Sequence, residues 1–86
     1  MDERRIEDKD KSFKANDGTV LLSLKDLYGY LSVMKDEDFV HHVTEHKNDF
    51  ASWVEHVHGD KFLASSMRRA STKEELRKAI FVAMFR

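Results

Sequence analysis

The order of apolar and polar positions divides the chain into a polar start, a short alternating stretch and a long helical remainder. Residues 1–11 contain nine charged side chains of both signs. Such a stretch buries too little apolar surface to offset the entropy of ordering it. We therefore expect a disordered charged tail over residues 1–11, followed by one small domain over residues 12–86.

The segment after this tail has the pattern of a β-hairpin. Two short runs, 12–15 and 19–22, flank the turn sequence Asn16-Asp17-Gly18, and Asp-Gly is a strong signal for a tight turn between two strands. A two-stranded hairpin is only marginally stable by itself. We therefore expect this hairpin to pack against the rest of the chain.

After the hairpin, apolar side chains recur at helical spacing in five segments, each preceded by a residue that can cap a helix. The predicted capping residues are Ser23, Asp36, Asn48, Asp60 and Ser71. The first two helices are expected over roughly 24–34 and 37–46. The third is expected to end at Gly59 in a left-handed C-cap, and the last to begin with a Ser-Thr-Lys-Glu capping box.

These elements predict a mainly α-helical fold with a minor β component, a compact bundle of about five short helices with a small N-terminal β-hairpin. The expected core residues are Leu27, Leu31, Phe39, Phe50 and Trp53. Gly29 lies inside the first predicted helix, where we interpret it as allowing close packing.

The amino-acid composition argues against several classes of function. The chain has no cysteine, which excludes disulfides, thiol catalysis and thiolate metal sites. Its net charge of -1 argues against nucleic-acid binding by bulk charge. No apolar run approaches the length of a membrane span, and the N-terminus has no hydrophobic signal region, so we expect a cytoplasmic protein. No catalytic constellation or small-molecule site stands out, and we expect a non-enzymatic protein.

Five sequence elements, in this order, resemble one known family. They are Asp17-Gly18-Thr19-Val20-Leu21, Ser23-Leu24-x-Asp26-Leu27, Asp38-Phe39-x-His41-His42-Val43, Asn48-Asp49-Phe50-Ala51-x-Trp53-Val54 and Gly59-Asp60. Together they resemble a small domain family of archaea and bacteria with unknown function, over roughly residues 13–78. The resemblance implies an accessory or interaction module, because members occur alone or attached to larger proteins, and it implies no activity or cofactor. The chain departs from the family pattern at His46, a position that is more often acidic.

All five histidines lie within the segment 41–58. His42 and His46 are four residues apart on the second predicted helix, a spacing that can chelate a divalent metal such as zinc. They also complete an H-x-x-E-H pattern, as in some zinc proteases, but a pattern this short arises by chance and the chain has little room for a substrate cleft. The alternative is that one or two histidines lie in a helix interface, hydrogen-bonded to backbone or carboxylate groups.

The end of the chain carries seven consecutive apolar residues, 79–85. One helix face is enough to complete the core, whereas Phe81 and Phe85 lie four residues apart on an adjacent face. Either this helix is buried almost all round, or it offers a second face to a partner. We predict a contact with a protein partner, most simply self-association as a homodimer, through Phe81, Phe85 and Met84.

Charge is distributed unevenly along the chain. Residues 35–60 contain two basic and seven acidic side chains, and residues 61–86 contain seven basic and two acidic ones. The basic segment has two interpretations: phosphate contacts in a nucleic-acid complex, or pairing with the acidic segment inside the fold. The candidate phosphate-contact residues are Arg68, Arg69, Lys73 and Arg77. The sequence therefore predicts a protein-interaction or accessory module, with metal binding and nucleic-acid binding as the alternatives.

Overall fold

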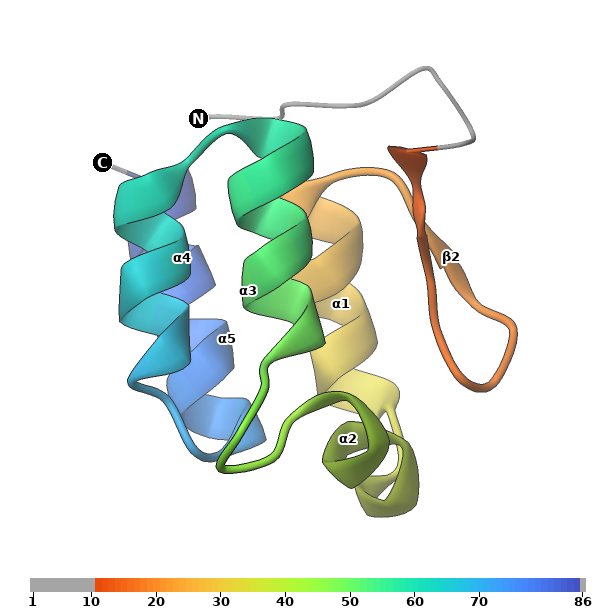
Figure 1. Ribbon diagram of the computed structural model, residues 1–86. Helices are drawn as coiled ribbons and strands as arrows, with labels where there is room; N and C mark the ends of the chain where they lie inside the picture. The colour runs from red at the N-terminus through yellow and green to blue at the C-terminus, as the bar shows by residue number, and fades with distance from the viewer. Residues whose placement is uncertain (1–10, 86) are drawn as a thin grey trace.

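The computed structural model describes residues 11–85, which form five α-helices and a two-stranded antiparallel hairpin (Figure 1). The elements in chain order are β1 (Phe13–Lys14), β2 (Val20–Leu21), α1 (Leu24–Val33), α2 (Asp36–His42), α3 (Asp49–Trp53), the π-helical turn η2 (Val54–His58), α4 (Lys61–Arg68) and α5 (Lys73–Met84). This arrangement confirms the predicted helical bundle with an N-terminal hairpin.

Helix α5 lies against both α1 and α4, and α3 packs against α4. Figure 1 shows α3 and η2 as one continuous run beside α4, with α2 at one end of the bundle and the hairpin along the side next to α1. Within residues 11–85, no helix has the length and apolar character needed to cross a membrane.

The hairpin forms as predicted, although each strand has only two residues. Gly18 has a φ of 93°, a left-handed conformation that glycine adopts without steric cost. The ring of Phe13 packs against Phe50 and Trp53, with centroids 4.8 and 5.9 Å away. Most of the predicted tail lies outside the described residues, but Lys11 is described, and its carbonyl accepts a hydrogen bond from Trp53 Nε1 at 2.8 Å.

Three of the predicted helix caps are confirmed. The side-chain oxygens of Ser23, Asn48 and Asp60 each accept a hydrogen bond from the backbone N–H three residues later. Gly59 ends the third helical run with a φ of 71°, as its predicted left-handed cap requires. The five predicted core residues are all buried as well. Local sequence therefore determines most helix boundaries in this chain.

Two other predicted caps are wrong. Asp36 is the first residue of α2, and Lys35 occupies the cap position without a side-chain hydrogen bond. The capping box of α5 begins one residue later than predicted, because Thr72 accepts from the Glu75 N–H and Glu75 accepts from the Thr72 N–H. The N–H of Ser71 also donates to the Glu75 carboxylate, and these hydrogen bonds lower the pKa of Glu75.

The predicted extension of the second helix to residue 46 is also wrong, because α2 ends at His42. Val43 pairs with Asn48 in an antiparallel bridge, and the chain between them turns. The residues of this turn, 44–47, are all polar and bring no apolar side chain to the core. His46 therefore lies beyond the helix that was expected to carry it.

Candidate interaction surfaces

The apolar side chains of α5 divide into a buried and an exposed set. The inner face is formed by Leu76, Ile80, Ala83 and Met84, all of which are buried. Met84 is only 5% exposed, so its predicted role as a partner-contact residue is wrong. Met84 follows Ile80 by four residues and shares its side of the helix.

The outer surface of α5 exposes Phe81, Val82 and Phe85, which are 47%, 55% and 57% accessible. We call these three residues the α5 apolar face. The rings of Phe81 and Phe85 lie 4.6 Å apart, and Tyr28 of α1 lies 6.0 Å from Phe81. Exposed aromatic residues in one contiguous group are typical of protein-interaction surfaces.

The α5 apolar face continues toward α4. A hollow of about 410 Å³ lies between the two helices, with Val82 on one side and Phe62 on the other. Phe62 is 71% exposed. At the opposite edge, the guanidinium of Arg77 lies 5.3 Å from the centre of the Tyr28 ring, within cation–π range. The apolar surface is therefore bordered by polar groups.

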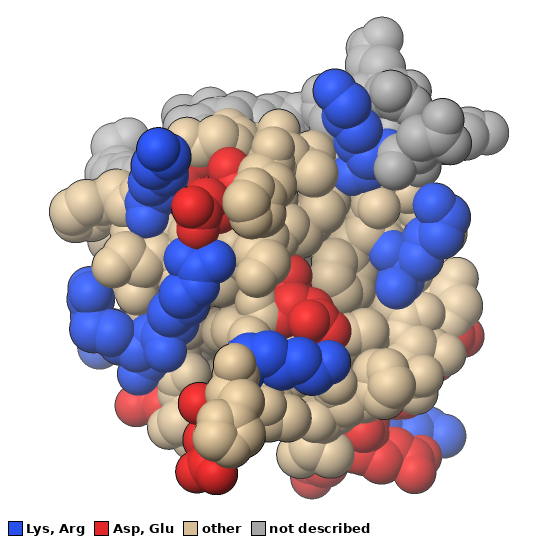
Figure 2. All heavy atoms as spheres, viewed as in Figure 1, with Lys and Arg blue, Asp and Glu red and all other residues tan. Residues whose placement is uncertain are grey.

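The four candidate phosphate-contact residues each contact other groups of the protein. Arg68 donates to Glu55 at 2.6 Å, and this hydrogen bond lowers the pKa of Glu55. Lys73 pairs with Asp36 at 2.7 Å. Figure 2 shows Lys and Arg side chains on the α4 side of the molecule with Asp and Glu side chains among them. For Arg68 and Lys73 the structure confirms the alternative interpretation, in which basic residues pair with the acidic segment.

The other two candidates contact their own surroundings. The Arg69 guanidinium donates to the hydroxyls of Ser65 and Ser66 at 3.2 and 3.3 Å. Arg77 lies over Tyr28, as described above. Each of these four basic side chains therefore contacts other groups of the protein, whereas a phosphate-binding surface uses basic side chains that contact phosphates.

His42 joins the hairpin to the helices. His42 is 5% exposed, and its ring packs against both Phe13 and Phe50, with centroids 5.1 and 5.2 Å away. The backbone N–H of Asn16 donates to Nε2 at 2.9 Å, so the ring proton of the neutral histidine is on Nδ1. Nδ1 then donates to Asp49 Oδ2 at 3.0 Å.

The contacts of His42 and His46 concern the metal site that was predicted for this pair. Both ring nitrogens of His42 are engaged by the protein, as the helix-interface interpretation expected. His46 is 85% exposed at its side chain and contacts the neighbouring Glu45 carboxylate. Because α2 ends at His42, His42 and His46 do not lie one turn apart on a helix, which is the arrangement that the metal pair requires. Within the described part of the chain, no three His, Asp or Glu side chains are grouped in a way that can hold a metal ion.

Asp49 is held as a carboxylate by this network. Burial alone raises the pKa of Asp49, but hydrogen bonds from His42 and Lys47 outweigh it, and the pKa lies below its ordinary value of 3.8. Asp49 therefore stabilises the fold at pH values above 3.8, and this contribution is lost as the pH falls through the folded-state pKa.

We expect the difference in unfolding free energy between the wild type and Asp49→Asn to be constant above about pH 5 and to shrink below about pH 4. The asparagine has no charge to lose, whereas the wild-type carboxylate becomes protonated. Urea unfolding at a series of pH values measures this difference. A difference that stays constant down to about pH 3 would contradict the assignment.

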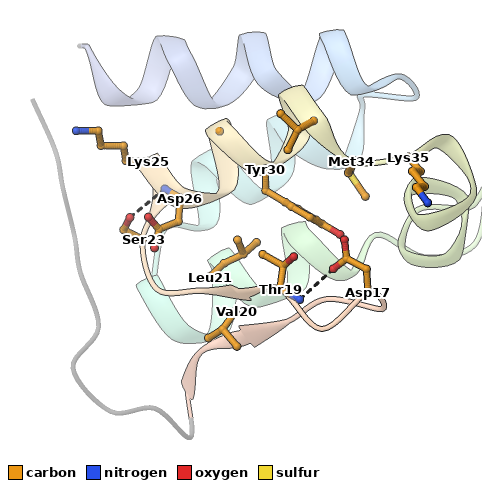
Figure 3. Close-up of a pocket in the computed structure, with 12 residues that line it drawn as sticks. Asp17, Thr19, Val20, Leu21, Ser23, Lys25, Asp26, Tyr30, Met34 and Lys35 are labelled. Carbon is orange, nitrogen blue, oxygen red and sulfur yellow. Dashed lines mark hydrogen bonds between the residues drawn. The ribbon is translucent and has the colours of Figure 1, made fainter.

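A groove of about 780 Å³ runs between β2 and α1 (Figure 3). Tyr30 of α1, the α1 C-cap residue Met34 and Leu21 of β2 are buried and line the groove. Burial and the neighbouring Asp17 carboxylate raise the pKa of Tyr30 to about 12. The tyrosine is therefore a neutral hydroxyl at physiological pH. Exposed Val33 lies at the rim of the same groove.

Gly29 also lines this groove, and its interpretation as a close-packing residue is wrong. A Cβ built on Gly29 meets no atom within 4 Å, and its backbone is ordinary right-handed helix. A glycine inside a helix costs about 0.5–1 kcal/mol relative to alanine, so folding alone does not favour glycine here. This groove was not predicted from the sequence, and the helical glycine is a signal that could have indicated it.

No match was found when the chain was compared with protein families, with curated proteins and with solved structures.

Proposed function

We propose that this protein is a non-enzymatic interaction module that associates with a second copy of itself through the α5 apolar face. The observation that supports this proposal is the exposure of Phe81, Val82 and Phe85 together on one side of α5. The core does not use these side chains, because the opposite side of α5 already supplies the buried contacts. An apolar surface of this kind gains stability when a partner removes it from water.

A second copy is the partner that fits this surface most simply. A two-fold dimer places the same patch of each subunit against the other, so the patch must be complementary to itself. The Phe81–Phe85 ring pair meets this requirement, because aromatic rings pack well against other aromatic rings in offset or edge-to-face geometry. The net charge of -1 also means that two copies repel each other only weakly.

The expected dimer is weak and reversible. The three residues of the α5 apolar face are about half exposed, so burying the rest of each contributes about 1 kcal/mol per side chain. Two copies together gain about 6 kcal/mol from six such side chains. This gain is of the same order as the cost of immobilising two molecules, about 4–15 kcal/mol. Association should therefore depend strongly on protein concentration.

The double variant Phe81→Asp, Phe85→Asp is expected to remain monomeric at concentrations where the wild type forms dimers. Each aspartate places a charge where the partner surface would bury it, which is unfavourable without a matching cation. Both positions are solvent-exposed in the monomer, so the fold should be retained. Multi-angle light scattering gives the molar mass, and circular dichroism checks the helical content.

The matched control is the double variant Val33→Asp, Val40→Asp. These two valines are 77% and 60% exposed on α1 and α2, away from the α5 apolar face. We expect this control to dimerise like the wild type. A wild type that stays monomeric, or a control that loses the dimer to the same extent, would contradict the proposal.

A further inference from the structure

We propose that His42 is a pH-sensitive contact, which holds the hairpin turn, residues 15–19, against α2 at neutral pH and releases it when the ring binds a second proton. The turn responds because the Asn16 N–H donates to the ring nitrogen that would bind this proton. This inference concerns the hairpin and α2, and it does not depend on association through α5.

The hairpin turn is attached to α2 through Asn16. Its backbone N–H donates to His42 Nε2 at 2.9 Å, and its side-chain Nδ2 donates to Asp38 Oδ1 at 3.0 Å. Inside the turn, the Ala15 N–H donates to the Thr19 carbonyl at 2.8 Å. This internal hydrogen bond does not involve α2, so the turn can leave α2 and keep its own conformation.

Protonation of His42 removes the acceptor that Asn16 uses. In the neutral ring, Nδ1 carries the proton and donates to Asp49 Oδ2 at 3.0 Å, so the free lone pair is on Nε2. A proton from solvent that binds this lone pair makes Nε2 a donor, and two donors that face each other form no hydrogen bond. The proton therefore binds when Asn16 has moved away. Lower pH favours the released form, because only that form binds the proton.

Two carboxylates near the ring favour a positive charge on His42. Asp49 of α3 contacts Nδ1, which is a donor in both the neutral and the protonated ring. Burial raises the pKa of Asp49, but hydrogen bonds from His42 and Lys47 hold the pKa below 3.8, so this carboxylate is charged wherever a histidine titrates. Asp38 of α2 is joined to the same site through Asn16. The protonated ring therefore has a charged partner in place.

The other side chains around the ring oppose a positive charge or are neutral. Lys47 Nζ lies 3.1 Å from the α3 carboxylate, and the His41 ring, which can also bind a proton, is 4.9 Å from the His42 ring. Phe13 of β1 and Phe50 of α3 pack against the ring and carry no charge. His41 is therefore the second titrating group that a test must separate from His42.

The release is local, because the rest of the hairpin has contacts of its own. The Phe13 ring packs against Phe50 of α3 with their centroids 4.8 Å apart. Figure 3 shows the Asp17 carboxylate of the turn pointing toward the Tyr30 hydroxyl of α1. We therefore expect Asn16 to leave α2 while β1 and α1 keep these contacts, with no change in helical content.

The experiment measures amide hydrogen exchange in the ¹⁵N-labelled full chain, with each rate corrected for the intrinsic pH dependence of exchange. This method detects the released form even as a minor population. An accessible imidazole has a pKa of about 6.5, so lowering the pH from about 7.5 to about 5.5 increases the released fraction about tenfold. We expect the protection of the Asn16 amide to fall by this factor. The Ala15 amide, which is bonded inside the turn, should keep its protection.

Long-range ¹H–¹⁵N spectra of the histidine rings test the protonation of the wild type without any substitution. At about pH 7.5, His42 should carry its proton on Nδ1 and none on Nε2. A proton on Nε2 at this pH would overturn the inference. The double variant Phe81→Asp, Phe85→Asp should give the same spectra and the same exchange, which keeps this test separate from that of self-association.

Two variants separate His42 from the other titrating groups. His42→Gln keeps an acceptor for the Asn16 N–H and does not titrate, so the protection of the Asn16 amide should be independent of pH. His41→Ala removes the exposed neighbouring histidine and should retain the tenfold change. Four results would overturn the inference: constant Asn16 protection in the wild type, an equal loss at Ala15, a response that persists in His42→Gln, or one that disappears in His41→Ala.

Discussion

His42→Ala is expected to lower the free energy of unfolding by about 3–4 kcal/mol. The substitution removes a buried ring that packs against both Phe13 and Phe50, and the cavity left behind is costly. It also leaves the Asn16 N–H without its acceptor and removes the neutral donor from Asp49. A domain of this size is stabilised by about 4–13 kcal/mol in total, so this one change removes a large share. Urea denaturation followed by circular dichroism measures the loss.

The matched control for this variant is His41→Ala. His41 is the adjacent residue on α2 and is exposed, so its replacement should change stability by no more than about 0.5 kcal/mol. Equal effects of the two substitutions would contradict the assignment of His42 as the contact that joins the hairpin to the helices.

Asn48→Ala is expected to cost about 3 kcal/mol, the second largest loss predicted for the chain. Asn48 is 8% exposed, and its side chain makes two hydrogen bonds with different structural roles. Its Oδ1 accepts from the Ala51 N–H and caps α3, while its Nδ2 donates to the Met67 carbonyl of α4 at 3.1 Å. Alanine removes the cap and the side-chain donor to the Met67 carbonyl, which then keeps only its backbone donors, among them the Ala70 N–H at 3.0 Å. Thermal and urea unfolding measure the combined effect.

Asn48→Ser separates the two contributions. Serine is a good helix cap, but its side chain is too short to reach Met67 from the same position. We expect Asn48→Ser to be more stable than Asn48→Ala by about 1 kcal/mol and still less stable than the wild type. If serine restores full stability, the hydrogen bond to α4 contributes nothing, and if serine equals alanine, the cap contributes nothing.

Local features of the sequence predicted most of the fold. Caps at Ser23, Asn48 and Asp60 act within one turn of helix, and Gly59 ends its helix by its own backbone conformation. The α5 capping box was displaced by one residue because two overlapping Ser/Thr-x-x-Glu patterns begin at consecutive positions. Spacing alone does not distinguish such patterns.

Features that depend on distant residues were missed. The backbone partner of His42 lies 26 residues earlier in the chain, so its buried hydrogen bond could be listed only as one alternative. The turn after α2 depends on the Val43–Asn48 bridge, which the helical pattern does not reveal. The groove arises where β2 meets α1, and it was not predicted from the sequence, in which Gly29 was interpreted as a close-packing residue.

The α5 apolar face was predicted in part. Phe81 and Phe85 are exposed and adjacent, as their four-residue spacing indicated. Met84 belongs to the core because the helix turns it toward Ile80, and Val82 extends the exposed face in its place. A run of consecutive apolar residues shows that two faces exist, but only helix packing decides which residue belongs to which face.

The most direct test of the central claim, association through the α5 apolar face, is the ¹H–¹⁵N spectrum of the unmodified chain at increasing concentration, from about 20 μM to about 1 mM. We expect progressive shifts centred on Phe81, Val82 and Phe85, with smaller shifts at Tyr28 and none in the hairpin. A spectrum that does not change over this range, or shifts centred on another surface, would contradict it.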